Sequence, residues 1–228
     1  MAGFTGASPI VTDGLVFAVD AANYESYPGS GTTWSDLAGS NDGTLTNGPT
    51  FDSANGGVID FDGTDDVVES SIDPSVFSTG HDAFTVSYWI NYESLNNYNT
   101  VFELRAGGSN AQWTDYNNIN DANRLYSYPN GAVRISDSSL SVNTWYNISV
   151  AITQGSGNTF STYINGQLDK TAGWNRNLGT VAKYRIGHNN TGTGVFNGQC
   201  SSISYYNRAL SAAEITQNYN ALKSRFNL

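Results

Sequence analysis

Acidic side chains are the first candidates for chemistry in this chain of 228 residues. The densest acidic segment spans residues 60–66 and contains Asp62, Asp65 and Asp66. These three aspartates are candidate ligands for Ca²⁺, which takes about six to eight oxygens from carboxylates and carbonyls on a flexible loop. The alternative is an ordinary hairpin turn held by Asx-type hydrogen bonds. The segment lacks the strict ligand spacing of an EF-hand loop, which favours the turn.

Aromatic side chains in polar segments are the second set of candidates, because the apolar face of a pyranose stacks on Trp or Tyr. Trp113, Tyr116 and Trp174 are the candidates for such a sugar-binding platform. Half-buried packing is an equal alternative for Trp174. Trp89 and Trp145 lie in the most regular predicted strands, so we assign them to the core.

Nucleophilic catalysis finds little support in the sequence. There is no Gly-x-Ser-x-Gly pattern, and the one cysteine, Cys200, lies in a predicted strand as a small buried hydrophobe. His81 and His188 each follow a glycine in a predicted loop, which is typical of exposed turn residues. A single cysteine also excludes an internal disulfide.

The N-terminal segment, residues 1–12, carries no charge and contains Phe4, Ile10 and Val11. The residue before Pro9 is biased towards extended conformations. We therefore predict an extended arm that adds to the edge of a partner's sheet or fills an apolar groove, with these three side chains as contacts. In that case its deletion leaves the fold intact. The alternative is a frayed terminus.

The scaffold that positions these candidates is predicted to be β-sheet. Phe84, Val86, Tyr88 and Ile90 form one face of the clearest period-two run, which predicts a central strand with that face in the core. Asn165 and Gly166 are a strong type I′ hairpin signal. Further strands are predicted at residues 15–20, 58–61, 66–70, 100–105, 112–116, 124–128, 133–136, 145–153, 159–164, 184–187 and 198–206.

One short helix is predicted at the end of the chain. Ser211 and Glu214 have the spacing of a capping box, which satisfies two backbone amides where a helix begins. Apolar residues then follow at steps of three and four, as on one face of a helix. Nothing earlier in the chain has comparable helical periodicity, so this helix is expected to pack on a sheet.

Several segments resemble laminin G-like domains of the concanavalin A-like lectin/glucanase superfamily. The similar segments follow the expected order, from about residue 14 to residue 224: residues 14–20, 34–39, 43–45, 61–68, 163–166, 196–199 and 203–215. The resemblance implies an all-β fold, an antiparallel jelly-roll β-sandwich with one short C-terminal helix, formed by residues 13–228 after the arm. It implies little about function, because the superfamily contains lectins, hydrolases and structural modules. Laminin G-like and pentraxin-like relatives often bind calcium at loop rims.

The same resemblance makes glycoside hydrolysis the first enzymatic activity to consider. Its glucanase branch carries catalytic carboxylates in a Glu-x-Asp-x-Glu pattern, whereas none of the five glutamates here has such neighbours. Retention of configuration needs two carboxylates about 5–5.5 Å apart. We therefore predict that the protein is not an enzyme.

Composition and charge limit the partners. The net charge of −10 argues against nucleic acid, whose phosphates require Lys and Arg. No Lys or Arg precedes Arg105, whereas fifteen acidic residues do, and we expect the two halves to interleave in one sandwich. No apolar run approaches the length of about 20 residues needed to span a membrane. The N-terminus has no basic, apolar leader of the secretory type, which suggests synthesis in a host cytoplasm.

The leading functional prediction is a non-enzymatic virion surface module, either a capsid decoration protein or a fibre or tail component of a tailed bacteriophage. Residues 11–23 and 26–37 resemble the laminin G-like domains of marine phage structural proteins. The expected partners are other virion proteins, further copies of the chain and a host-surface glycan. The alternative is a calcium-dependent lectin of a bacterial surface, and a glycoside hydrolase comes third.

Overall fold

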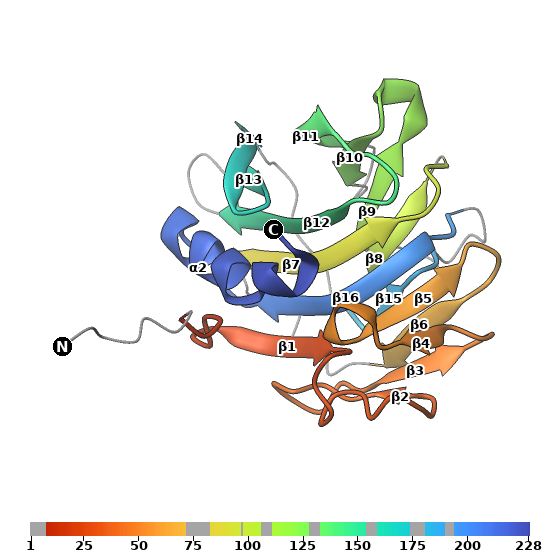
Figure 1. Cartoon of the computed structure of the whole chain (residues 1–228). Helices are drawn as coiled ribbons and strands as arrows, with labels where there is room; N and C mark the ends of the chain where they lie inside the picture. The colour runs from red at the N-terminus through yellow and green to blue at the C-terminus, as the bar shows by residue number, and fades with distance from the viewer. Residues whose placement is uncertain are drawn as a thin grey trace.

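The computed structural model describes residues 8–71, 83–96, 98–105, 111–127, 133–153, 159–173, 181–189 and 194–228. Two antiparallel sheets of eight strands each stack face to face as a sandwich (Figure 1). This confirms the predicted all-β sandwich, with one short α-helix at the C-terminal end of the described chain. Among these residues, no helix combines the length and apolar character needed to cross a membrane.

The first sheet, sheet A, contains the central strand of the fold. Its strands, in spatial order, are β14 (Gln167–Gly173), β13 (Thr159–Ile164), β12 (Trp145–Thr153), β7 (Phe84–Tyr92), β16 (Asn197–Tyr206), β5 (Val58–Asp62) and β4 (Thr50–Asp52), and β1 (Leu15–Asp20) also pairs with β16.

The second sheet, sheet B, is built from the remaining strands. They are, in spatial order, β11 (Val133–Ser139), β10 (Arg124–Ser127), β9 (Ala111–Asn118), β8 (Asn99–Arg105), β15 (Lys183–Ile186), β6 (Val67–Ser71), β3 (Gly43–Thr46) and β2 (Thr33–Trp34). Three short 3₁₀ helices complete the elements: η1 (Ala54–Gly56), η2 (Ile119–Asp121) and η3 (Lys223–Phe226).

Strand β7 lies at the centre of sheet A, as its alternation predicts. Phe84, Val86, Tyr88 and Ile90 point into the core between the sheets and are buried. The opposite face of β7 is buried as well, because Trp89 lies under the C-terminal helical segment. A strand covered on both sides in this way has few exposed positions.

Helix α2 (Ala212–Leu222) covers the outer face of sheet A, where it lies in front of β7 and β16 in Figure 1. The predicted capping box is present, since the Ser211 hydroxyl accepts from the Glu214 N–H while the Glu214 carboxylate accepts from the Ser211 N–H at 2.8 Å. Arg208 donates to both carboxylate oxygens of Glu214, at 2.6 and 3.1 Å. This pairing lowers the pKa of Glu214 to about 2.

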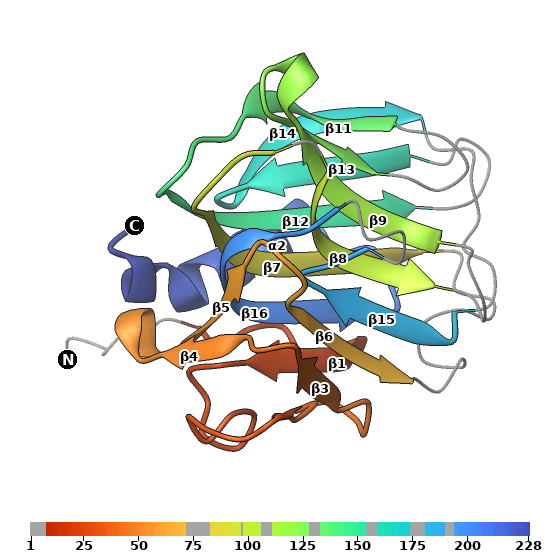
Figure 2. The same cartoon turned by 90° about the vertical axis from the view of Figure 1, so that its right-hand side faces the viewer.

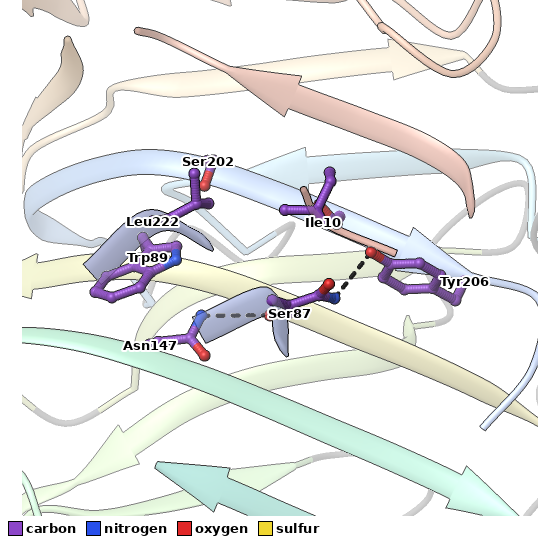
Figure 3. A pocket seen from close by; sticks show the side chains of 9 residues that line it. Ile10, Ser87, Trp89, Asn147, Ser202, Tyr206 and Leu222 are labelled. Carbon is purple, nitrogen blue, oxygen red and sulfur yellow. Dashed lines mark hydrogen bonds between the residues drawn. The ribbon is translucent and has the colours of Figure 1, made fainter. Parts of the chain in front are cut away.

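The described end of the N-terminal arm is bound to this helix. The Val11 N–H donates to Asn218 Oδ1 at 2.7 Å, and the Tyr206 hydroxyl donates to the Val11 carbonyl at 2.9 Å. Ile10 lines a small pocket between helix and sheet (Figure 3), together with Ser87, Trp89, Asn147, Ser202, Ser204, Tyr206, Asn218 and Leu222. Ile10 and Val11 thus contact the chain's own helix and sheet, and their role in docking a partner stays a prediction. Phe4 lies outside the described residues.

Candidate functional site

The outer face of sheet B is the candidate site, because helix α2 covers the other outer face. In Figure 2 the C-terminal helical segment lies on the left, away from β8, β9 and β15 on the right. Strands β8 and β9 alternate between the two sides of sheet B. Leu104 and Trp113 point into the core, which places Glu103, Thr114 and Tyr116 on the outer face.

A row of alternating charges crosses the middle of this face. Strand pairing places Arg185 directly between Glu69 and Glu103. Arg185 donates to Glu69 Oε2 from Nε at 2.9 Å, and its Nη2 lies 2.8 Å from the same oxygen. Arg105 pairs with Glu103 at 3.3 Å, with both side chains only 3% exposed. The charges on this row are therefore already compensated within the protein.

Three tyrosines with neighbouring rings, which we call the tyrosine row, lie beside the charge row. The rings of Tyr98 and Tyr116 have centroids 5.1 Å apart, and those of Tyr116 and Tyr126 are 5.8 Å apart. Tyr116 is buried between its neighbours, whereas Tyr98 is 50% exposed. Tyr98 also has a left-handed backbone conformation, with φ of 66°. A bulky residue in this region is unusual and is enriched at functional sites.

A charged cluster closes one end of the tyrosine row. The Tyr126 hydroxyl donates to Asp121 Oδ2 at 2.8 Å, and this bond is the main reason that the pKa of Asp121 is lowered. Arg124 binds the other oxygen of Asp121 at 2.8 Å, and Arg134 lies 3.2 Å from Asp137. Aromatic rings, guanidinium groups and carboxylates therefore lie within one continuous chain of contacts.

The predicted aromatic platform is only partly present at this site. Trp113 is fully buried and packs edge-on against Phe84 at 5.4 Å, so its ring offers no face to a ligand. Tyr116 is on the outer face as part of the tyrosine row, but it too is buried. Trp174 lies outside the described residues. Trp113 is buried because the inward face of β9 belongs to the core. Tyr116 is buried because neighbouring tyrosines cover the outward face of the same strand.

Tyr98 and Tyr126 are site residues that the sequence analysis missed. Tyr126 lies opposite Tyr116 in the β9–β10 pairing, and such cross-strand pairs cannot be assigned without the register. Tyr98 had one available signal, because it is an aromatic residue in an asparagine-rich segment between two strands.

The predicted calcium ligands come together at the β5–β6 turn. Asp62, Asp65 and Asp66 each offer a carboxylate oxygen, and these oxygens all lie within 4.8 Å of one another. The Thr64 N–H donates to Asp62 Oδ1 at 2.7 Å, and the Asp62 N–H donates to Asp66 Oδ2 at 2.9 Å. These are the Asx-type bonds of the turn interpretation. Burial, with the nearby negative charges, raises the pKa of Asp66.

A comparison with protein families identifies the fold. The model of a family described as concanavalin A-like lectin/glucanases superfamily matches residues 62–216, which is more than half of the chain. The chain belongs to this superfamily. This match confirms, at the level of the family, the resemblance seen in the sequence. No curated protein sequence matches it.

Solved structures share this concanavalin A-like fold at low sequence identity. A Trypanosoma rangeli sialidase in complex with sialic acid superposes with a TM-score of 0.68 at 15% identity, over 96% of this chain and 34% of that one. The chain thus spans about a third of the length of this sialidase. Domain 4 of AbnA, an extracellular GH43 arabinanase from Geobacillus stearothermophilus, in complex with arabinotriose, gives 0.69 at 18% identity, over 90% and 98% of the two chains. The binding domain of botulinum neurotoxin DC, in complex with SialylT, gives 0.69 at 14%, over 92% and 52%.

Proposed function

We propose that this domain is a non-enzymatic glycan-adhesion module that binds its ligand across the tyrosine row, and that it works on the surface of a virion. The observation that carries the glycan proposal is the half-exposed ring of Tyr98, which packs at a tilt against the ring of Tyr116. Three structures that share the fold are named as complexes with sialic acid, arabinotriose and SialylT, which supports a glycan as the class of ligand.

The tyrosine row provides the two kinds of contact that a sugar requires. The Tyr98 ring offers apolar surface, and because the ring already packs against Tyr116, little conformational entropy is lost on binding. Beyond Tyr126, the carboxylate of Asp121 and the guanidinium of Arg134 offer an acceptor and donors for hydroxyl groups. Arg134 is 40% exposed and so remains accessible.

The carboxylates on this face support a non-catalytic role. A glycosidase needs a general acid with a raised pKa and a second carboxylate opposite to it. Here Arg185 stands between Glu69 and Glu103 in the sheet, and each of these glutamates also pairs with an arginine. Both carboxylates are thus engaged by arginines and do not face each other across a space for a sugar.

A glycan array tests the binding proposal. We expect the wild type to bind a defined set of glycans and Tyr98→Ala to weaken that binding at least about tenfold, or about 1.4 kcal/mol. Tyr24→Ala is the matched control, because Tyr24 is 75% exposed but lies outside the row. Equal losses in both variants, or no glycan bound by the wild type, would contradict the proposal.

The virion location is tested separately by mass spectrometry of purified particles. The chain should be present in a fixed stoichiometry relative to the capsid or tail proteins. Its absence from particles would remove the virion assignment and leave the glycan proposal untouched.

Calcium-dependent glycan binding is a second candidate function. It is favoured by one observation, the three carboxylates within 4.8 Å of one another at the β5–β6 turn. An array repeated with a chelator separates the two candidates, because binding through the tyrosine row alone needs no metal.

A further inference from the structure

Six polar side chains lie inside the sandwich, between the two sheets, where a core is normally apolar. We call this group the polar nest, and each member is 0% exposed: Tyr88, Tyr92, Asn99, Asp115, Asn117 and Ser127.

Strand pairing places the members of the nest next to one another. On sheet B, Asn99 lies directly opposite Asn117, and Ser127 lies directly opposite Asp115. Asp115 and Asn117 are two residues apart on β9, so they share its inner face. From sheet A, the Tyr88 hydroxyl donates to Asp115 Oδ2 at 3.0 Å. Tyr92, four residues further along β7, also lies in the core, and burial together with the nearby charge of Asp115 raises the pKa of its hydroxyl.

Several donors and acceptors of the nest have no hydrogen-bond partner among the described residues. Within them, the carboxamide oxygen and nitrogen of Asn117, the carboxamide oxygen of Asn99, and the hydroxyls of Tyr92 and Ser127 have no partner. Buried polar groups in native proteins are nearly always hydrogen-bonded, because an unsatisfied one loses its hydration without compensation. Unsatisfied groups on four buried side chains therefore indicate a bound species.

We infer that the polar nest is a binding site for ordered water molecules, which join Asn99, Asn117, Ser127 and Tyr92 into one network. Water fits because the nest presents both kinds of group: Asn117 Nδ2 needs an acceptor, while the two carboxamide oxygens need donors. A cation would serve the oxygens only. Burial raises the pKa of Asp115 to about 7, so this carboxyl gains a proton more readily than an exposed one and can then act as a further donor.

The position of the nest gives it a role. The inner face of β9 carries Asp115 and Asn117, and the outer face of the same strand carries Tyr116 of the tyrosine row. The water network therefore lies on the opposite side of β9 from Tyr116 and stabilises the strand that carries this part of the candidate site. This inference concerns the core of the fold and does not depend on the ligand of the outer face.

A high-resolution crystal structure of the full chain is the direct test. We expect ordered waters within about 3.2 Å of Asn99, Asn117, Ser127 or Tyr92. Water relaxation dispersion in solution should likewise detect long-lived internal waters. An empty nest in the crystal, or oxygen ligands at about 2.3–2.6 Å from one density peak, would overturn the proposal, the latter in favour of a cation.

A double-mutant cycle with Tyr92→Phe and Asn117→Leu is the thermodynamic test, because the groups these substitutions remove have no other partner among the described residues. If the two side chains share water, each single substitution lowers the melting temperature by about 2–4 °C, and the double variant loses less than the sum. If the nest is dry, each substitution removes an unsatisfied group, so the melting temperature rises or is unchanged and the effects add. Should a variant fail to fold, the wild-type crystal structure and relaxation measurement still decide.

Discussion

The outer faces of the two sheets differ in what lies on them. On sheet A, the Trp89 ring stacks on Phe226 at 4.2 Å and on Tyr219 at 5.7 Å, so the C-terminal segment closes that face. On sheet B, the corresponding positions hold ion pairs and the tyrosine row, with Tyr98 half-exposed. Large apolar side chains need a cover, whereas on sheet B the charges are compensated by ion pairs and the ring of Tyr98 remains half-exposed. This difference is the reason that we place the proposed glycan site on sheet B.

The C-terminal segment is held on sheet A by polar contacts as well as by rings. Arg225 donates to both carboxylate oxygens of Asp20, at 3.1 and 3.0 Å, and to the Ser201 hydroxyl at 2.6 Å. Its guanidinium also lies 5.4 Å from the Phe226 ring. The cover of sheet A is therefore part of the folded core.

The largest expected effect comes from Trp89→Ala, which should destabilise the fold by about 3–5 kcal/mol, because a large buried ring is lost from a packed interface. Tyr98→Ala should cost less than about 1 kcal/mol, since half of that ring is already in water. Urea denaturation of both variants measures the difference. Similar losses of stability would mean that the two faces do not differ in the way proposed here.

A pH titration of stability tests the inner side of sheet B. The pKa of Asp115 is raised to about 7 by burial, against 3.8 for an exposed carboxyl, so the folded state binds the proton more tightly. The contribution of Asp115 to stability is therefore largest below about pH 4 and is lost as pH rises towards 7. Between pH 5 and pH 8 we expect a loss of about 3 kcal/mol.

Asp115→Asn is the matched variant for that titration, because it keeps the shape and removes the charge. The difference between wild type and variant should be small at pH 5 and should grow up to about pH 8, where the variant is the more stable. Glu214 acts in the opposite direction but in another window: its lowered pKa adds stability that is lost only as pH falls below about 4.5. Parallel pH profiles would contradict the burial effect assigned to Asp115.

The fold could be predicted from the sequence because its signals are local. The alternation in β7 and the capping box at Ser211 each depend on residues a few positions apart, and both are confirmed. The tyrosine row could not be predicted in the same way. Tyr98, Tyr116 and Tyr126 meet only through the pairing of β8, β9 and β10, and a shift of one residue would turn each ring to the other face.

The contacts of the N-terminal arm also could not be predicted from local patterns, because they join residues far apart in the sequence. Val11 bonds to Asn218, 207 positions away, and no local pattern reports such a contact. The prediction of a free docking arm rested on composition and on Pro9, which describe the conformation of the segment but not its partner. The missing information was that Asn218, on the buried side of helix α2, binds the backbone of Val11.

Deleting residues 2–12 should lower the melting temperature by about 2–6 °C, because it removes the bonds from Val11 to Asn218 and Tyr206. Deleting residues 2–7 is the control, since it keeps Pro9, Ile10 and Val11. Calorimetry of the two truncations gives the difference. Equal melting temperatures would restore the interpretation of the whole segment as a dispensable arm.

The smallest expected effect concerns metal at the aspartate turn, which lies at the edge between the two sheets. Removal of divalent cations with EDTA should leave the melting temperature unchanged to within about 1 °C, because backbone amides already occupy one oxygen each of Asp62 and Asp66.

Asp65→Asn is the informative variant. It removes one negative charge from beside Asp66 and leaves both backbone bonds in place, so it should raise stability slightly, with or without EDTA. A wild-type melting temperature that falls on chelation, together with a variant that no longer responds to it, would instead establish a calcium site. The difference between the two faces would then include a metal-dependent rim, and chelation should be repeated in the glycan assay.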